Sequence, residues 1–145
     1  MMIALASDHG AFALKEKVKA YLLETGYEVE DFGTYSTESC DYTDFAVLAA
    51  RAVAEGTCER GIVLCTTGIG MSIAANKVRG VRCALCTDTI MAEMTRRHND
   101  SNVLALGAGI SGELAALRIV HTWLGTDYEG GRHQRRIDKI TALEQ

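Results

Sequence analysis

The 145-residue sequence has no proline, no hydrophobic stretch long enough to cross a membrane and no excess of basic residues. Without proline, glycines and helix-capping side chains must mark the ends of helices and strands. A membrane-spanning helix needs about 20 apolar residues in a row, so we expect none. The first residues, acidic at Asp8 and without a basic stretch, are not typical of a signal peptide. The formal charge of −4 argues against general nucleic-acid binding.

The cysteines also lack a pattern: there are five of them, an odd number, without the spacing of a disulfide framework. We therefore expect free thiols and a reducing, cytoplasmic location. Cys83 and Cys86 form a C-x-x-C pair, but they fall in a strand-like segment, where residues three apart point to opposite faces. The pair is therefore not expected to bind a metal ion or to form a disulfide.

The composition is 48% hydrophobic and 23% charged, which is typical of a globular protein. A chain of this length can bury about two thirds of the surface that its unfolded form exposes, so we expect one domain over residues 1–145. Acidic residues dominate the first part of the chain, whereas Arg132, His133, Arg135, Arg136 and Lys139 cluster near the end. Such a cluster fits either a small anion such as phosphate or the solvated face of a helix.

Strand-like and helix-like segments alternate along the whole chain. The expected strands are 2–7, 27–32, 61–65, 81–86 and 102–106. The expected helices are 11–24, 45–55, 71–77, 89–97, 111–124 and a final basic helix from about 132 to 143. This order predicts an α/β fold, a Rossmann-like three-layer α/β/α sandwich in which a five-stranded parallel sheet is covered on both faces, with a C-terminal helix.

Two helix caps and one buried helix face follow from the same pattern. Asp88 is expected to cap the helix at 89–97, because Asp is a favoured N-cap residue. Ser111 is expected to cap the next helix in the same way. Helical spacing predicts the buried face of that helix, which consists of Leu114, Leu117, Val120 and Leu124.

Ligands of such sheets bind at the carboxyl ends of the strands, and polar residues gather there in this sequence. The first strand is followed by Asp8 and His9, and the third ends in Cys65 before Thr66-Thr67-Gly68-Ile69-Gly70. The positive end of the following helix favours a thiolate at Cys65, which could act as a base or a nucleophile. The alternative is a small buried core residue, since free cysteines are often buried.

The segment from Gly68 to Gly70 offers backbone amides to an oxyanion, or is simply a tight turn. The third glycine of a dinucleotide fingerprint would stand at Ile73, so a nucleotide-binding module of the flavodoxin type is disfavoured. No arginine follows any cysteine by six residues, which disfavours a cysteine phosphatase. His9 and His98 are either site residues or ordinary polar loop residues, and His121, inside a helix, is expected to be structural.

Together these residues resemble the type B ribose-5-phosphate isomerases, a family that includes galactose-6-phosphate and allose-6-phosphate isomerases. The resemblance runs the length of the chain, and its motifs in this order are specific. The matching segments are 7–10 (SDHG), 41–42 (DY), 65–70 (CTTGIG), 95–99 (TRRHN), 102–107 (NVLALG) and 128–134 (YEGGRHQ).

The resemblance implies an aldose–ketose isomerisation through a cis-enediolate, without a metal ion or an organic cofactor. It implies that Cys65 abstracts the proton, that His98 protonates the ring oxygen and that Thr67 passes a proton between two oxygens. The implied binding residues are Asp8 for a sugar hydroxyl, Tyr42 for the pocket wall, Thr66, Gly68, Ile69, Gly70 and Asn99 for the oxyanion, and His9, Arg132 and Arg136 for the phosphate. It further implies a homodimer with shared active sites, in which the arm after Gly131 reaches the partner, and it leaves a tetramer open.

One position departs from the family pattern. Ribose-type members usually carry an arginine where this sequence has Gly109. Losing a charged hydrogen bond to phosphate costs about 1–3 kcal/mol, and the smaller residue leaves room for a longer sugar. We therefore keep an isomerase of a hexose 6-phosphate as an alternative to an enzyme of pentose phosphate metabolism. A non-catalytic sugar-phosphate sensor is a second alternative.

Overall fold

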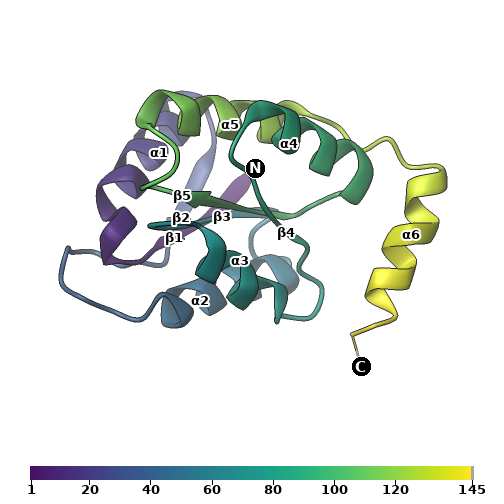
Figure 1. Ribbon diagram of the computed structural model, residues 1–145, viewed down its shortest axis with the longest axis horizontal. Helices are drawn as coiled ribbons and strands as arrows, with labels where there is room; N and C mark the ends of the chain where they lie inside the picture. Colours follow the sequence, from purple (N-terminus) through teal and green to yellow (C-terminus); the bar gives the residue numbers. More distant parts are fainter. Residues whose placement is uncertain (145) are drawn as a thin grey trace.

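The computed structural model describes residues 1–144 and contains one parallel sheet in the strand order β2-β1-β3-β5-β4 (Figure 1). The strands are β1 (Met2–Ser7), β2 (Glu28–Asp31), β3 (Arg60–Cys65), β4 (Cys83–Leu85) and β5 (Val103–Gly107). The order reverses between β1 and β3, so the carboxyl ends of these two strands mark the point where ligands bind in this class of sheet. The predicted α/β sandwich is confirmed.

Helices cover both faces of the sheet and one helix stands apart from it (Figure 1). One face carries α1 (Phe12–Glu24), α4 (Thr89–Met94) and α5 (Glu113–Gly125), and the other carries α2 (Tyr42–Ala54) and α3 (Ile69–Asn76). A 3-10 turn, η1 (His9–Ala11), precedes α1, and a π-helical turn, η2 (Thr95–Asn99), continues α4. The C-terminal α6 (Arg132–Thr141) lies to one side of the sandwich.

Side-chain size alternates along the central strands and sorts the core into two clusters. Ile3 and Leu5 of β1 face α1 and α5, whereas Ala4 and Ala6 face α2. Successive residues of a strand point to opposite faces, so β1 carries large apolar side chains on one face and alanines on the other. An alanine-rich helix, α2, packs against the face with the alanines, and its buried residues are Ala46, Ala49, Ala50, Ala52 and Val53.

The C-x-x-C pair behaves as predicted. Cys86 belongs to the cluster under α1 and α5, and Cys83 packs against the cluster under α2 and α3. Burial raises the pKa of each thiol to about 12. Both side chains are free, and neither is suited to metal binding or to thiol chemistry near neutral pH.

Three local predictions were wrong. The helix expected from residue 45 begins at Tyr42, which places Tyr42 on α2 and not in a loop. Asp88 caps α4 as expected, but α5 is capped by the backbone of Gly112, so Ser111 is not a cap. Of the predicted buried face of α5, only Leu114 was wrong: it lies in the first turn and is 66% exposed, whereas Leu117 packs against the core and Val120 and Leu124 are buried. The helix also buries Ala116, Ile119 and Trp123.

β4 is three residues long, half the expected length, and it lies at an edge of the sheet. The side chain of Asn76 accepts a hydrogen bond from Cys83 N at 2.8 Å and donates one to Cys83 O at 2.9 Å. The amide thus takes the place of a neighbouring strand at this point, which protects an edge that could otherwise pair with another chain. No helix within residues 1–144 is long and apolar enough to cross a membrane.

A buried ion pair ties α1 to the end of β2. The Lys15 side chain is fully buried, and its Nζ lies 2.7 Å from both carboxylate oxygens of Asp31. Burial alone raises the pKa of Asp31, but hydrogen bonds from Lys15 and from the Gly33 amide outweigh it, so the pKa lies below its ordinary value. A lowered folded-state pKa means that this carboxylate stabilises the fold above its unfolded-state pKa.

We expect Asp31→Asn to lower the free energy of unfolding at pH 7 by about 3 kcal/mol, because it leaves the buried Lys15 charge without its partner. As the pH falls below about 4, the unfolded wild-type chain binds a proton at Asp31 before the native state does, so this stabilisation is lost and the difference between the two proteins shrinks. Urea unfolding followed by Trp123 fluorescence at pH 7, 5 and 3.5 measures the difference. Glu24→Gln, on the exposed end of α1, is the control, and a difference that stays constant with pH contradicts the prediction.

Candidate active site

The first group of predicted site residues lies at the carboxyl ends of β1 and β3. Asp8 caps the turn η1, accepting a hydrogen bond from Ala11 N at 3.2 Å, and is 8% exposed. Thr66 follows β3 and lies against this turn: a Cβ at Gly10 would collide with the Thr66 hydroxyl and lie 3.5 Å from Asp8 Oδ1. The two loops can therefore meet only because residue 10 has no side chain.

Cys65 is the last residue of β3, and its thiol is almost fully buried. The Gly68 amide, at the N-terminus of α3, donates a hydrogen bond to Cys65 Sγ over 3.1 Å. Gly68 has a left-handed backbone, with φ of 78°, and a Cβ there would lie 2.6 Å from the Leu85 side chain. An amide donor at a helix N-terminus stabilises negative charge on sulfur.

The chain that leaves β5 supports the loop after Cys65. Gly109 N donates to Thr66 O at 2.7 Å, and a Cβ at Gly107 would lie 2.5 Å from the carbonyl carbon and oxygen of Thr67. Thr67 itself is exposed, and its hydroxyl accepts from Ile69 N at 3.2 Å. Thr67 is thus fixed by its own helix and by a glycine of the neighbouring strand.

Tyr42 and His9 border the same loop. A Cβ at Gly70 would lie 2.7 Å from the Tyr42 ring, so Gly70 lets α2 and α3 place the phenol beside the N-terminus of α3. His9 Nδ1 accepts a hydrogen bond from Cys40 N at 3.2 Å. A neutral His9 therefore carries its proton on Nε2, where it can donate to a ligand. Cys40, whose thiol lies 3.8 Å from the same nitrogen, is a neighbour that the sequence did not indicate.

A second group of residues lies at the other end of the sheet. His98 and Asn99 belong to η2, which directly precedes β5, so they lie near the amino ends of the strands. The His98 ring stacks on the buried His133 of α6, with centroids 4.2 Å apart. Glu129 receives hydrogen bonds from Arg97 and His133, and the Arg97 hydrogen bond lowers the pKa of Glu129.

The structure does not bring these two groups together within one chain. No hydrogen bond or ion pair joins the loops around Cys65 to η2 or α6 in the part of the chain that is described, residues 1–144. Arg132 and Arg136 are exposed on α6, and their guanidinium groups make no ion pair with any residue in 1–144. One chain thus holds two separate half-sites: the Cys65 half, which consists of Asp8, His9, Tyr42 and 65–70, and the His98 half, which consists of His98, Asn99, Arg132 and Arg136.

His133 and Glu129 also belong to the His98 half. The sequence suggested His133 only as part of a basic cluster for an anion or a solvated face, but the structure buries it against His98. Glu129 had been assigned no role. The signal in the sequence was that both residues lie in the matching segment 128–134 (YEGGRHQ). His121 lies elsewhere and makes a hydrogen bond of 2.9 Å with the Tyr21 hydroxyl. That contact fits the structural role expected for it.

His98, Glu129 and His133 are the one cluster of potential metal ligands in residues 1–144, with donor atoms within 4.8 Å of one another. A bound ion lies in the plane of each imidazole that coordinates it. The two rings are stacked and only 17° from parallel, so their planes meet only well beyond metal-bonding distance of either ring. Glu129 is also engaged by Arg97. The cluster in this arrangement does not fit a shared metal ion.

Comparisons with known proteins agree with one another. The family model described as Ribose/Galactose Isomerase matches residues 3–140. Ribose-5-phosphate isomerase B of Escherichia coli is 50% identical over 99% of this chain and 96% of its own. The solved ribose-5-phosphate isomerase B of Clostridium thermocellum superposes with a TM-score of 0.99, at 53% identity over 99% of this chain and 97% of that one.

A further solved relative has a ligand bound. The Mycoplasma genitalium ribose-5-phosphate isomerase B with bound ribulose-5-phosphate has a TM-score of 0.95 and 40% identity over 99% of this chain and 95% of that one. Fold, site and sequence therefore define an α/β sugar isomerase. The chain belongs to the ribose/galactose isomerase family.

We expect Gly107→Ala to lower the rate of sugar-phosphate isomerisation at least about tenfold, because the new Cβ displaces the Thr67 backbone and a shift near 1 Å can cost about 100-fold in rate. Overpacking should also cost about 1–3 kcal/mol of stability. Steady-state rates and thermal unfolding measure the two effects. Gly125→Ala is the control, because a Cβ there meets nothing within 4 Å. Equal rates for the two variants would contradict the support proposed for Thr67.

Proposed function

We propose that this protein interconverts ribose 5-phosphate and ribulose 5-phosphate through a cis-enediolate, and that residues 1–145 form a single isomerase domain. The observation that carries the mechanism is the hydrogen bond from Gly68 N to Cys65 Sγ, in a chain half identical to a ribose-5-phosphate isomerase B. Free ribose 5-phosphate is a closed ring, and its C2 proton is only weakly acidic. The site must therefore open the ring, remove the proton and hold the oxyanion that forms.

Ring opening comes first and uses both half-sites. His98 donates a proton to the ring oxygen as the bond from that oxygen to C1 breaks. Asp8 accepts the proton of the C1 hydroxyl, which becomes the aldehyde oxygen. His98 suits this role because it is half-buried and held against His133, so its ring is oriented before the sugar arrives.

Proton transfer then uses the Cys65 half. The Cys65 thiolate removes the C2 proton, and charge develops on O1, where the amides of 66–70 and the Asn99 side chain hold it. Thr67 passes the O2 proton to O1, and the Cys65 thiol returns its proton to C1, which gives the ketose. The exposed Thr67 hydroxyl, fixed by Ile69 N at 3.2 Å, supports this assignment.

The phosphate is held by Arg132, Arg136 and His9. The two arginines are four residues apart on α6, share one face of the helix, and have their guanidinium groups unpaired within residues 1–144. Guanidinium binds phosphate oxygens in a bidentate manner that a lysine cannot match. The Nε2 proton of His9 supplies a further donor from the Cys65 half.

A second copy of the chain would complete each site, with the Cys65 half of one subunit facing the His98 half of the other. Two observations support a homodimer of this kind. Ile69 and Ile73 are 52% and 57% exposed on α3, beside the Cys65 loop. Ile140 and Leu143, on and after α6, are also exposed, so both half-sites carry apolar surface that a partner could cover. We place the enzyme in the cytoplasm because all five thiols are free.

A hexose 6-phosphate remains the second candidate substrate because of Gly109. A Cβ at Gly109 would lie 3.1 Å from the Thr66 side chain, so a residue at this position borders the loop that holds the oxyanion. Glycine removes one phosphate-side cation of the ribose type and leaves space at that border. A sugar-phosphate sensor would need the phosphate residues but not Cys65 or His98.

Initial rates on ribose 5-phosphate, allose 6-phosphate and galactose 6-phosphate test the substrate, with ketose formation as the measurement. We expect ribose 5-phosphate to be preferred. In Cys65→Ala, turnover should fall at least about 1,000-fold, as removal of the base demands, while calorimetry still detects sugar-phosphate binding. Solvent deuterium should no longer enter C1 of ribulose 5-phosphate.

A preference for a hexose phosphate would contradict the pentose assignment and identify Gly109 as part of an enlarged site. Binding without turnover by the wild-type protein on all three sugars would support the sensor. Cys58→Ala, which removes a buried thiol whose hydrogen-bond partner is Glu30 of β2, is the matched control for Cys65→Ala and should keep its rate.

The shared site predicts complementation between inactive subunits. A purified heterodimer of one Cys65→Ala chain and one His98→Asn chain has one site with both residues intact, so it should recover about half of the wild-type rate. A heterodimer of Cys65→Ala with Thr67→Val damages the Cys65 half of both sites and should stay inactive. If the first heterodimer is as inactive as its parents, each site lies within one chain.

A further inference from the structure

The turn that carries His98 and Asn99 has an unusual backbone. η2 is a π-helical turn, a type that is uncommon and often occurs at functional sites. It ends at Asp100, which has a left-handed conformation with φ of 46° and ψ of 45°, and the Asp100 amide donates to Thr95 O. Glycine and asparagine adopt this conformation more readily than aspartate. Something around Asp100 must hold it there.

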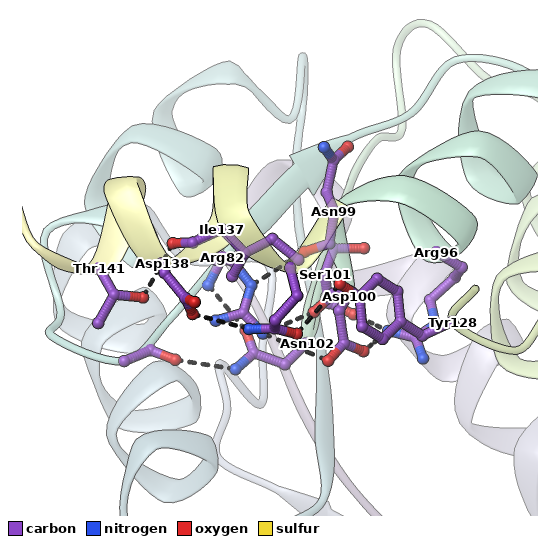
Figure 2. A network of polar contacts seen from close by, with 12 residues as sticks. Arg82, Arg96, Asn99, Asp100, Ser101, Asn102, Tyr128, Ile137, Asp138 and Thr141 are labelled. Carbon is purple, nitrogen blue, oxygen red and sulfur yellow. Dashed lines mark hydrogen bonds and ion pairs between the residues drawn. The ribbon is translucent and has the colours of Figure 1, made fainter. Parts of the chain in front are cut away.

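Arg82, which precedes β4, holds this turn from one side (Figure 2). Its Nε donates to Asn99 O at 2.9 Å, and its Nη2 donates to Asp100 O at 2.8 Å. The Arg82 backbone is fixed in turn, because its amide donates to Asn102 Oδ1 at 2.8 Å. A cation at these carbonyls also interacts favourably with the negative end of the helix dipole.

Arg96 holds the Asp100 carboxylate from the other side. Its Nη1 lies 2.9 Å from Asp100 Oδ1, and the same group donates to Ser101 O at 2.6 Å. Arg96 is only 5% exposed, whereas Arg82 is half-buried and reaches Asp100 Oδ2 at 3.7 Å. The carboxylate thus lies between two guanidinium groups, which explains an aspartate at a position where the backbone alone favours glycine.

We propose that Arg82 and Asp100 are positioning residues for ring opening, an inference that rests on the proposed function of His98. Arg82 holds the carbonyls of Asn99 and Asp100, and Arg96 holds the Asp100 carboxylate and the Ser101 carbonyl. The His98 ring rests on His133. The position of the His98 imidazole is therefore fixed by contacts to the backbone that follows it and by the stacking of His133 on its ring. Without the Arg82 contacts, the two carbonyls at the end of the turn lose their donors and the turn can relax.

The substrate pair separates ring opening from proton transfer. Ribulose 5-phosphate cannot close a five-membered ring, because its C5 oxygen carries the phosphate, so it enters the site already open. Exchange of its C1 hydrogen with solvent needs Cys65 and the oxyanion donors, most of which belong to the Cys65 half. Turnover of ribose 5-phosphate needs His98 in addition. A positioning role predicts that turnover of ribose 5-phosphate falls more than hydrogen exchange at C1 of ribulose 5-phosphate.

The test compares Arg82→Gln and Asp100→Asn with wild type in two assays: kcat/KM for ribose 5-phosphate, and deuterium entry at C1 of ribulose 5-phosphate by NMR. We expect turnover to fall about 10- to 100-fold, the range for a misplaced acid, and to fall at least tenfold more than exchange. Asp100→Asn keeps a residue that accepts the left-handed conformation, so it should fold even if Arg82→Gln does not.

Thr25→Val is the matched control. Thr25 is another residue whose side chain donates to helix-end carbonyls, with Oγ1 at 2.8 Å from Tyr21 O and 3.2 Å from Leu22 O of α1. Because α1 carries no proposed site residue, Thr25→Val should lower thermal stability without changing the ratio of the two rates. Equal losses of turnover and exchange in the Arg82 and Asp100 variants would show a merely structural role and overturn the inference.

His98→Asn separates failure of this inference from failure of the function on which it rests. A selective loss of turnover in His98→Asn, without one in the Arg82 and Asp100 variants, overturns the positioning role alone. Equal losses of turnover and exchange in His98→Asn overturn the role of His98 in ring opening, and the positioning role with it. Selective losses in all three variants support both.

Discussion

The contact on which the proposed chemistry depends is the hydrogen bond from the Gly68 amide to the sulfur of Cys65. It exists because β3 turns into α3 within three residues, and that turn needs a left-handed backbone at Gly68. The turn also passes so close to β5 and β4 that any side chain at 68 would strike Leu85 or the Leu106 backbone. The environment of the thiol therefore depends on the close approach of this turn to the two neighbouring strands.

The same topology keeps the two half-sites apart. In a parallel sheet, every helix returns the chain from the carboxyl ends of the strands to the amino ends. Cys65 ends a strand and His98 ends such a returning helix, so the two lie at opposite ends of the sheet. A single chain of this fold has no direct way to bring them together. In the homodimer that we propose, a second copy would supply the missing half, and α6, which stands beside the sandwich, belongs to the half that would be donated (Figure 1).

The sequence indicated the Cys65 half better than the His98 half, and the reason is physical. Strand periodicity and the rule that ligands bind at strand carboxyl ends place Asp8 and Cys65 together without any structure. No comparable rule says where the end of a helix points, so the meeting of His98 with His133 required the fold. The errors at Tyr42 and Ser111 were of another kind. They concern helix starts, which neighbouring backbone can decide without a capping side chain, as it does at Gly112.

The two halves also differ in how their positions are fixed. The Cys65 half uses glycines: at 10, 68, 70 and 107 the missing side chain allows a close approach, to the side chains of Thr66, Leu85 and Tyr42 and to the backbone of Thr67. The His98 half uses charge: the carboxylate of Asp100 and two arginines hold a turn that its own backbone preference does not favour. Close packing gives the thiol a fixed donor. The ion-paired turn instead holds the exposed Asn99 by its carbonyl and keeps His98 half-buried against His133. In the homodimer that we propose, this turn would present both side chains to the Cys65 half of the other subunit.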